Sequence, residues 1–388
     1  MSSIEVSSYS PKKISLVVLF LVKRRLSWGA KKSLMECAHF WEKDPRICKL
    51  SVLVPKDEIA SFKGKINLTL EALPKRDYLF GYPKLKKRIS EIRPDIVFIP
   101  TARWINVGGI PITAMVRNME PLVVPFQFKY FLESVKNLVR AYWTRKACLR
   151  ANSIITVSKH VQNYVLNIYS VSESKTARIY EGIRELGSVE ATQKPESISD
   201  SISFLFTAGS LRPYRGLEDA VKALALLQSI SPDIYLAIAG KPDNGTKGYV
   251  KEIKRLSKKH DIDNRVIWLG HLNSKEMKWC YEKCRAFLMT SRVEACPNTA
   301  LEAMSHLCEI VSTNTPPMPE VFADAALYYS AGDYRALATR IESVLRTTDQ
   351  DLQRRRAAAS RRARDFSWET TASSIIDVLV KTVDKYSD

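Results

Sequence analysis

The stretch S-R-V-E-A-C-P-N-T-A-L-E-A-M-S, from Ser291 to Ser305, joins an apolar run to a helix start and carries two carboxylates, Glu294 and Glu302. The run before it, 286–289, predicts a buried parallel strand. A strand, a tight turn and a helix N-terminus form the place where an open α/β sheet holds an anion such as a phosphate. The stretch therefore predicts an anion site at the edge of a sheet.

The helix expected after Pro297 begins with polar residues. Asn298 or Thr299 can cap it, because each carries a side-chain oxygen that accepts a backbone N–H. Glu302 then lies one turn into the helix, where a carboxylate can accept hydrogen bonds from two vicinal hydroxyls, as on a ribose. Two glutamates eight residues apart are solvated surface residues in most chains, and only their place beside the positive end of the helix dipole favours a functional interpretation.

On both sides of this stretch, apolar runs alternate with longer amphipathic stretches, which is the pattern of βαβ units. The pattern predicts an α/β protein with two Rossmann-like, doubly wound parallel-sheet domains facing a cleft, where ligands are expected. The expected strands are 14–21, 50–54, 96–99, 122–124 and 154–157 in the first half, and 203–208, 234–239, 266–269, 286–289, 310–312 and 326–329 in the second.

A polar stretch without periodicity, 186–201, predicts the boundary between the two halves. We expect a first Rossmann-like domain at 1–190, a linker at 191–201 and a second Rossmann-like domain at 202–365. The last segment, 366–388, contains an amphipathic pattern that stands apart from the second sheet. We expect it to form a helix that crosses back to pack on the first domain.

The formal net charge of +19 is concentrated in the first half, where residues 1–190 hold 32 lysines and arginines against 16 aspartates and glutamates. This imbalance predicts an anionic partner: a membrane surface, a nucleic acid or a phosphorylated substrate. A basic nucleic-acid-binding protein is therefore an alternative, although the sequence contains no helix-turn-helix, RRM or finger pattern. We expect no nucleic acid as a partner.

The cysteines and the N-terminal apolar run indicate the compartment. Seven cysteines without a C-x-x-C pair suit a reducing environment and argue against a disulfide framework or zinc site. The five histidines lack metal-ligand spacing, so we expect no metal and no other cofactor. The apolar run 14–22 is too short to span a bilayer, and Lys23-Arg24-Arg25 follows it where a signal peptide has small residues. These features predict a cytoplasmic protein.

A second motif, F-T-A-G-S-L-R-P-Y-R-G at 206–216, follows the first expected strand of the second half. Gly209 allows the backbone to approach a ligand closely, and Arg215 can neutralise a leaving diphosphate. Such a loop is weak evidence for a phosphate site when it is taken alone.

Together these motifs resemble the retaining glycosyltransferases of family 4, of the group 1 type, which have the GT-B fold. The stretch Ser291–Ser305 is similar to their E-x7-E motif, and 301–333 is similar to their stretch through the P-E and G-D landmarks. The resemblance implies that Glu302 binds the nucleotide ribose and that Glu294 lies at the donor sugar. The diphosphate would rest between them, near Asn298 and Thr299.

The sequence departs from the family pattern around the expected donor pocket. Cys296-Pro297 stands where a phenylalanine-glycine pair is usual, and Leu307 where a glycine is usual. In the loop that reads G-R-L-x-P-x-K-G in the family, Ser210 replaces the arginine and Arg215 the lysine. One expected cation is therefore missing, and Arg212, two residues on, is the candidate to supply it.

In the first half, Gly29, Arg117 and Asn118 follow expected strands and are the acceptor-side candidates. The family often has a histidine near Arg117-Asn118, and this chain has none there. An ordinary turn is the alternative interpretation for Gly29. We also expect basic clusters and aromatic residues of this half to form a membrane-facing patch. Its members are Lys12, Lys13, Lys23–Arg25, Lys31, Lys32 and Lys84–Arg88, with Trp28, Trp41, Phe80, Tyr82 and Trp104.

The resemblance implies a metal-independent enzyme that moves a sugar from a nucleotide-diphosphate sugar to a glycan or lipid-linked acceptor with retention of configuration. The expected setting is bacterial cell-surface polysaccharide or lipopolysaccharide synthesis, at the inner face of the cytoplasmic membrane. Another GT-B enzyme, such as a nucleotide-sugar epimerase, is the alternative, and it would act without an acceptor.

Overall fold

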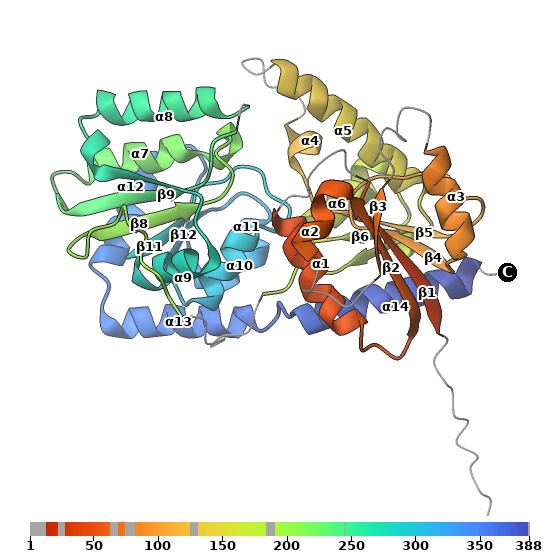
Figure 1. Ribbon diagram of the computed structural model, residues 1–388. Coiled ribbons are helices and arrows are strands. Elements are labelled where there is room, and N and C mark those ends of the chain that lie inside the picture. The colour runs from red at the N-terminus through yellow and green to blue at the C-terminus, as the bar shows by residue number, and fades with distance from the viewer. Residues whose placement is uncertain are drawn as a thin grey trace, which may run out of the picture.

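The computed structural model describes residues 13–21, 28–62, 69–73, 82–124, 131–183, 191–243 and 245–386. They form two α/β domains side by side, each built around one parallel sheet with helices on its faces (Figure 1). The expected α/β class with two doubly wound sheets is confirmed.

The first sheet has seven strands in the order β3-β2-β1-β4-β5-β6-β7. Its central strands are short runs of buried aliphatic residues, as parallel strands covered on both faces require. The strands are β1 (Ile14–Leu19), β2 (Ile47–Pro55), β3 (Thr69–Leu73), β4 (Ile96–Ile99), β5 (Ile112–Val116), β6 (Ser153–Thr156) and β7 (Thr176–Arg178).

The second sheet has six strands in the order β10-β9-β8-β11-β12-β13. In both sheets the strand order reverses beside the first strand, and such switch points are where open sheets bind ligands at the carboxyl ends of their strands. The strands are β8 (Ser203–Ala208), β9 (Ile234–Ala239), β10 (Val266–Gly270), β11 (Ala286–Met289), β12 (Ile310–Thr313) and β13 (Leu327–Tyr329).

Helices alternate with these strands through both domains. They are α1 (Trp28–Trp41), α2 (Ile59–Phe62), α3 (Pro83–Ile92), α4 (Glu120–Val123), α5 (Phe131–Arg150), α6 (Lys159–Tyr169), α7 (Leu217–Leu226), α8 (Lys247–Lys259), α9 (Ser274–Lys283), α10 (Asn298–Ser305), α11 (Met318–Phe322), α12 (Tyr334–Leu345), α13 (Asp349–Ala363) and α14 (Trp368–Tyr386).

The last helix, α14, returns to the first domain, as expected from its amphipathic pattern. It packs against α1, and its apolar side chains, Ile376 and Leu379 among them, are buried in the same hydrophobic cluster as β1 and β4. The Trp41 indole Nε1 donates a 3.1 Å hydrogen bond to the carbonyl oxygen of Ala372. In Figure 1 the blue chain runs beneath both domains, α13 under the second and α14 under the first.

The structure corrects one expected strand and adds three that were not expected. The expected strand 122–124 is wrong: this segment is the end of α4, because Pro121 sits in the first turn of a helix, while the strand is β5, five buried residues at Ile112–Val116. The edge strands β3 and β7 were not expected, because they lack a continuous apolar run. Strands β4, β8, β9 and β11 have the expected bounds.

One member of the expected membrane-facing patch, Trp41, does not lie on the surface. Trp41 is only 3% exposed and belongs to the core of the first domain. Lys31 and Lys32 lie on α1, Lys84–Arg88 on α3, and Trp104 follows β4, so the members do not share one element. Lys12, Lys23–Arg25 and Phe80 lie outside the described residues.

Candidate active site

The loop that follows β11 is held in place from both domains. The hydroxyl of Thr290 donates a 2.6 Å hydrogen bond to the carbonyl oxygen of Arg215, and Thr313, at the end of β12, donates a 2.7 Å bond to the carbonyl oxygen of Ser291. Val293 and Ala295, which flank Glu294, are buried in the hydrophobic cluster of the first domain. Glu294 is therefore fixed where the two domains meet.

Glu294 and Arg215 form an ion pair in which Arg215 Nη1 lies 2.5 Å from Glu294 Oε1. The same Nη1 donates a 3.3 Å hydrogen bond to the Ser291 hydroxyl. Burial raises the pKa of Glu294, and the positive charge of Arg215 lowers it in part. The two residues proposed from the sequence to act at the chemistry thus lie in contact, 79 positions apart in the chain.

Gly209 provides the space that the Arg215 side chain occupies. It has a φ of +138°, and a Cβ atom built at this position would lie 3.1 Å from the guanidinium carbon of Arg215. A larger residue here would both strain the backbone and displace the guanidinium. A pocket opens beside Gly209 at the carboxyl ends of β8, β9 and β11. Its lining includes Thr207, Ser210, Arg215, Thr290 and Ser291.

Ser210 stands where the family pattern has an arginine, and its hydroxyl contacts two neighbours. It accepts a 3.4 Å hydrogen bond from Arg215 Nε and lies 3.4 Å from the Tyr214 hydroxyl. Burial raises the pKa of Tyr214, so the phenol is neutral at physiological pH and can donate a hydrogen bond. Tyr214 was not singled out from the sequence, where nothing distinguishes it from a surface tyrosine of a turn.

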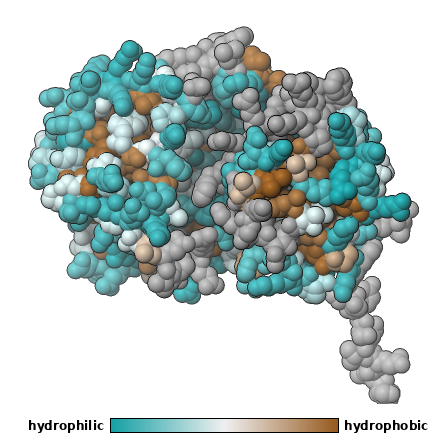
Figure 2. All heavy atoms as spheres, viewed as in Figure 1, coloured by the Kyte–Doolittle hydropathy of each residue, from teal (hydrophilic) through white to brown (hydrophobic). Residues whose placement is uncertain are grey.

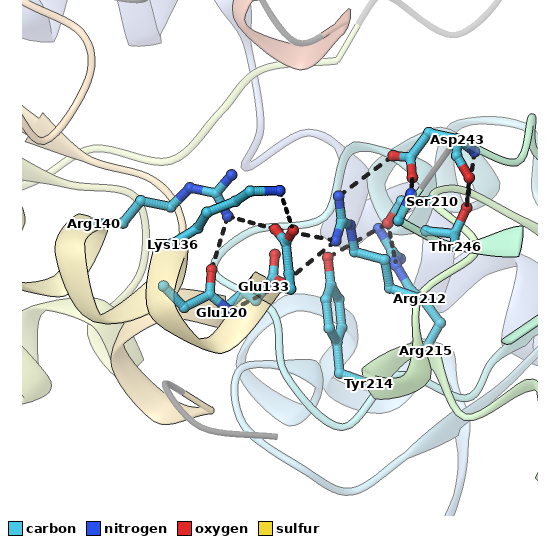
Figure 3. Close-up of polar contacts among 12 residues, drawn as sticks. Glu120, Glu133, Lys136, Arg140, Ser210, Arg212, Tyr214, Arg215, Asp243 and Thr246 are labelled. Carbon is cyan, nitrogen blue, oxygen red and sulfur yellow. Dashed lines mark hydrogen bonds and ion pairs between the residues drawn. The ribbon is translucent and has the colours of Figure 1, made fainter. Parts of the chain in front are cut away.

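The Arg212 guanidinium contacts carboxylates of both domains. Its Nη1 lies 3.5 Å from Glu133 and 3.8 Å from Glu120, both in the first domain, and its Nη2 lies 3.4 Å from Asp243. Figure 3 shows Arg212 between these carboxylates, with Tyr214 and Arg215 beside it. Arg212 therefore has carboxylate partners in both domains, of which Glu133 was not expected from the sequence.

The first turn of α10 has no side-chain cap. Its N-cap residue is Pro297, and no side chain caps the helix, so the expected caps at Asn298 and Thr299 are wrong: both residues lie inside the helix. Asn298 Oδ1 and Thr299 Oγ1 are buried and have no hydrogen-bond partner in the described structure. Uncapped backbone N–H groups and the helix dipole favour an anion at this position.

Glu302 lies one turn further along α10 and is held from two sides. Its Oε2 accepts a 3.0 Å hydrogen bond from the Tyr281 hydroxyl, and its Oε1 lies 2.8 Å from Nζ of Lys32 in the first domain. Burial raises the pKa of Tyr281 well above its usual value, so it donates as a neutral phenol. The Tyr281 ring stacks on that of His306 at a centroid distance of 5.5 Å.

Of the three acceptor-side candidates, Gly29 lies opposite α10 and Arg117 contacts Gly29. Gly29, at the start of α1, faces Asn298, whose Nδ2 would lie 2.9 Å from a Cβ atom at position 29. Arg117 donates a 3.3 Å hydrogen bond to the carbonyl oxygen of Gly29 and pairs with Glu181 at 2.6 Å. Asn118 is exposed, and its Oδ1 accepts a 3.0 Å hydrogen bond from the backbone N–H of Glu120. Gly29 and Arg117 thus lie at the domain boundary, whereas the Asn118 side chain forms a local turn.

The departures from the family pattern have visible consequences. Leu307, which stands where a glycine is usual, has a φ of +54°, a conformation that costs a side-chain-bearing residue about 1–2 kcal/mol. Cys296 is partly buried and packs against the hydrophobic clusters of both domains. The turn before α10 is therefore packed between the domains.

Two further features concern metals and membranes. Within the residues described above, no three His, Cys, Asp or Glu side chains are grouped so that they could hold a metal ion. In the same part of the chain, no helix is long and apolar enough to cross a membrane.

Two family models match consecutive parts of the chain. The model described as "Glycosyltransferase Family 4" matches residues 34–185, and the one described as "Glycosyl transferases group 1" matches residues 188–364. The first match contains α1 beyond its first turns and most of the first sheet. The second contains the Gly209 loop, the Arg215–Glu294 pair and α10.

Curated relatives are distant. Over 230 residues the chain is 25% identical to glycogen synthase of Mycobacterium tuberculosis, an alignment that covers 59% of this chain and 54% of the relative. It is 19% identical over 239 residues to the O-antigen chain mannosyltransferase RfbU of Salmonella typhimurium, covering 61% of this chain and 62% of RfbU. The chain thus spans less than two thirds of the length of these relatives.

A solved structure is similar over nearly the whole chain. HepE from Anabaena, in complex with UDP-glucose, superposes with a TM-score of 0.74 at 18% identity, and the match covers 94% of this chain and 99% of HepE. At this identity the likeness establishes the fold, which is the GT-B arrangement of two Rossmann-like domains. With both family models matching in order on that fold, the chain belongs to glycosyltransferase family 4.

Proposed function

We propose that the protein is a glycosyltransferase that moves a sugar from a nucleotide-diphosphate sugar to a glycan or lipid-linked acceptor, with retention of configuration and without a metal cofactor. The observation that carries the proposal is the Arg215–Glu294 ion pair at the carboxyl ends of β8 and β11, next to the uncapped N-terminus of α10. A cation and a helix dipole converge there on a position suited to a diphosphate.

In this proposal the donor's parts contact different residues. Glu302 accepts hydrogen bonds from the ribose hydroxyls, since each of its oxygens has a lone pair beyond those used by Lys32 and Tyr281. The diphosphate lies at Asn298 and Thr299, where the buried Thr299 hydroxyl has no partner and can donate a hydrogen bond to it, and beside Gly209 and Ser210. Charge that develops on the leaving diphosphate is stabilised by Arg215 and by the α10 dipole.

Glu294 is proposed to orient the donor sugar by accepting hydrogen bonds from its hydroxyls. Its pairing with Arg215 at 2.5 Å supports this role over that of a general base, because a base must be free to take a proton from the acceptor. In a retaining reaction of this kind, the acceptor hydroxyl enters on the face from which the diphosphate leaves. NMR of the first-formed product with an anomerically pure donor tests this, and inversion would contradict it.

The proposed setting is the synthesis of a cell-surface polysaccharide or lipopolysaccharide at the inner face of the cytoplasmic membrane. RfbU is named as an O-antigen chain mannosyltransferase, and HepE was solved with UDP-glucose, which supports a nucleotide sugar as donor and a growing glycan as acceptor.

A thermal-shift screen with UDP, GDP, ADP and dTDP and their sugars tests the donor, because a ligand that binds only the folded state raises the melting temperature. The Glu302→Ala variant should lose the shift. An epimerase, the alternative within the same fold, would convert the nucleotide sugar with no acceptor present, and such turnover would overturn the transferase proposal. A nucleic-acid-binding protein would show no nucleotide shift and salt-dependent binding of RNA or DNA.

A further inference from the structure

The helix α5 carries an exposed hydrophobic stripe on a face that the candidate active site does not use. It holds five of the ten large hydrophobic side chains that are exposed in the described part of the chain, with exposed fractions between 42% and 61%. A contiguous exposed apolar surface of this kind marks an interaction site. The members of the stripe are Val135, Leu138, Val139, Tyr142 and Leu149.

Successive members of the stripe are three, one, three and seven positions apart, a spacing that places all five on one side of a helix. The opposite side is already packed, since Asn137, Ala147 and Cys148 are at most 1% exposed. Figure 1 shows α5 along the upper edge of the first domain, and Figure 2 shows hydrophobic surface in that region. One face of α5 is therefore buried against the first domain, whereas the other face is apolar and exposed.

Basic side chains and tryptophans border the stripe. Lys146 lies within it, with Nζ 5.1 Å from the ring centroid of Trp143 and 5.8 Å from that of Trp104. Arg145 and Arg150 are exposed beside Leu149. Over its length α5 has five basic residues and one acidic residue, Glu133. Cations and tryptophans at the border of an apolar stripe are the features that hold a helix at an anionic lipid interface.

We propose that the outer face of α5 docks on an anionic lipid bilayer, with the helix lying in the plane of the interface. A second copy of the chain fits this face poorly, because a two-fold contact through α5 would set its cations against one another. An anionic bilayer matches both the apolar stripe and the charges beside it.

Docking through α5 would place the candidate active site next to the membrane. Glu133, in the first turn of α5, contacts Arg212 of the second domain, and Asn137 donates a 3.4 Å hydrogen bond to Glu120. The end of α5 that points to the domain boundary thus lies beside the donor-side loop. The docking itself does not depend on the proposed reaction, whereas the delivery of a lipid-linked acceptor along this helix rests on it.

Flotation of the full chain with phosphatidylcholine vesicles, with and without phosphatidylglycerol, tests the proposal. We expect binding to the anionic vesicles that weakens at high salt. The double substitution Leu138→Ser and Val139→Ser should lower the partition coefficient about tenfold, because it removes apolar area from the interface. The pair Arg145→Gln and Arg150→Gln should lower it for anionic vesicles. Ile168→Ser, at a position 60% exposed on α6 of the same domain, is the matched control and should change nothing.

Unchanged binding by the stripe variant, or an equal loss in the Ile168→Ser control, would overturn the proposal. So would a dimer in sedimentation equilibrium that the stripe variant abolishes, because the face would then belong to a second copy. All substituted side chains are exposed, so melting temperatures should stay constant and a folding defect can be recognised. The nucleotide thermal shift, measured without vesicles, reports on the proposed reaction separately.

Discussion

Nζ of Lys32 lies 2.8 Å from Oε1 of Glu302, so that the first helix of one domain contacts a carboxylate one turn into α10 of the other. Both side chains are largely buried, with exposed fractions of 14% and 25%. If Glu302 binds the ribose as proposed, Lys32 fixes the orientation of that carboxylate. The affinity for nucleotide then depends on how the two domains sit against each other.

The substitution Lys32→Met should weaken nucleoside diphosphate binding about tenfold, equivalent to about 1.4 kcal/mol, because Glu302 loses its fixed cation. Isothermal titration calorimetry measures this. Lys31→Met is the control, since Lys31 pairs with Glu58 at 2.6 Å and does not reach Glu302. Equal effects of the two substitutions would mean that Lys32 acts only through the net charge of the protein and not through its contact with Glu302.

The substitution Glu302→Ala should weaken binding at least 100-fold, because hydrogen bonds to a charged acceptor contribute about 1.5–3 kcal/mol each. Calorimetry with the ribonucleotide and its 2′,3′-dideoxy analogue tests the assignment to the ribose. The variant should lose the discrimination that the unmodified protein makes between them. Unchanged affinity for the ribonucleotide would remove Glu302 from the donor site.

The pH profile of kcat/KM should respond to Arg215. Burial raises the pKa of Glu294 and Arg215 opposes this, so Arg215→Met should raise the pKa of Glu294 further. The carboxylate then becomes protonated at a higher pH, so the acidic limb of the kcat/KM profile should shift to higher pH. Turnover should also fall about 1000-fold at the optimum, as when a charge-stabilising donor is removed. Arg215→Lys retains the charge and should leave the limb in place.

The substitution Gly209→Ala should impair turnover beyond its effect on stability. A Cβ atom there would lie 3.1 Å from the Arg215 guanidinium and would displace it from Glu294. Gly270→Ala is the control, because Gly270 also has a positive φ, of +66°, but a Cβ atom there meets nothing within 4 Å. Both variants should lower the melting temperature, and only Gly209→Ala should lower kcat. Equal kcat values would contradict the proposed role of the loop.

The substitution Ile376→Ala should destabilise the first domain by about 2–5 kcal/mol, because it opens a cavity under α14, where Ile376 is fully buried. Thermal or urea unfolding measures this. Ile168→Ala, at an exposed position of the same domain, should change stability by less than about 0.5 kcal/mol. A small effect at both positions would mean that α14 contributes little to this core.

The second sheet was the part best predicted from the sequence. Strands β8, β9 and β11 are buried on both faces, and continuous apolar runs such as Ala286–Met289 mark such strands. The strand expected at 122–124 was wrong because its apolar residues follow Pro121, which begins a short helix instead. The edge strand β7 is three residues long and partly exposed, so it carried no pattern to detect.

The contacts between the domains could not be predicted in this way. Hydrophobic periodicity indicates which face of an element is buried within its own domain, and it carries no information on which polar residues of two domains meet. Lys32 is 270 positions from Glu302 in the chain, and Glu120 is 92 positions from Arg212. The E-x7-E motif named Glu294 and Glu302, and the loop at 206–216 named Arg215. The contacts that Lys32, Tyr281 and Glu120 make with site residues became visible only in the folded structure.

The return of α14 to the first domain affects the order in which the protein can be completed on the ribosome. β1 to β7 leave the ribosome first, but the core around Trp41 stays open on one side until α14, which begins at Trp368, has been synthesised. The strands of the second domain and its helices up to α13 all precede α14 in the chain. The hydrophobic core of the second domain can therefore be completed earlier. The half of the protein that is translated first is therefore the half whose hydrophobic core is finished last.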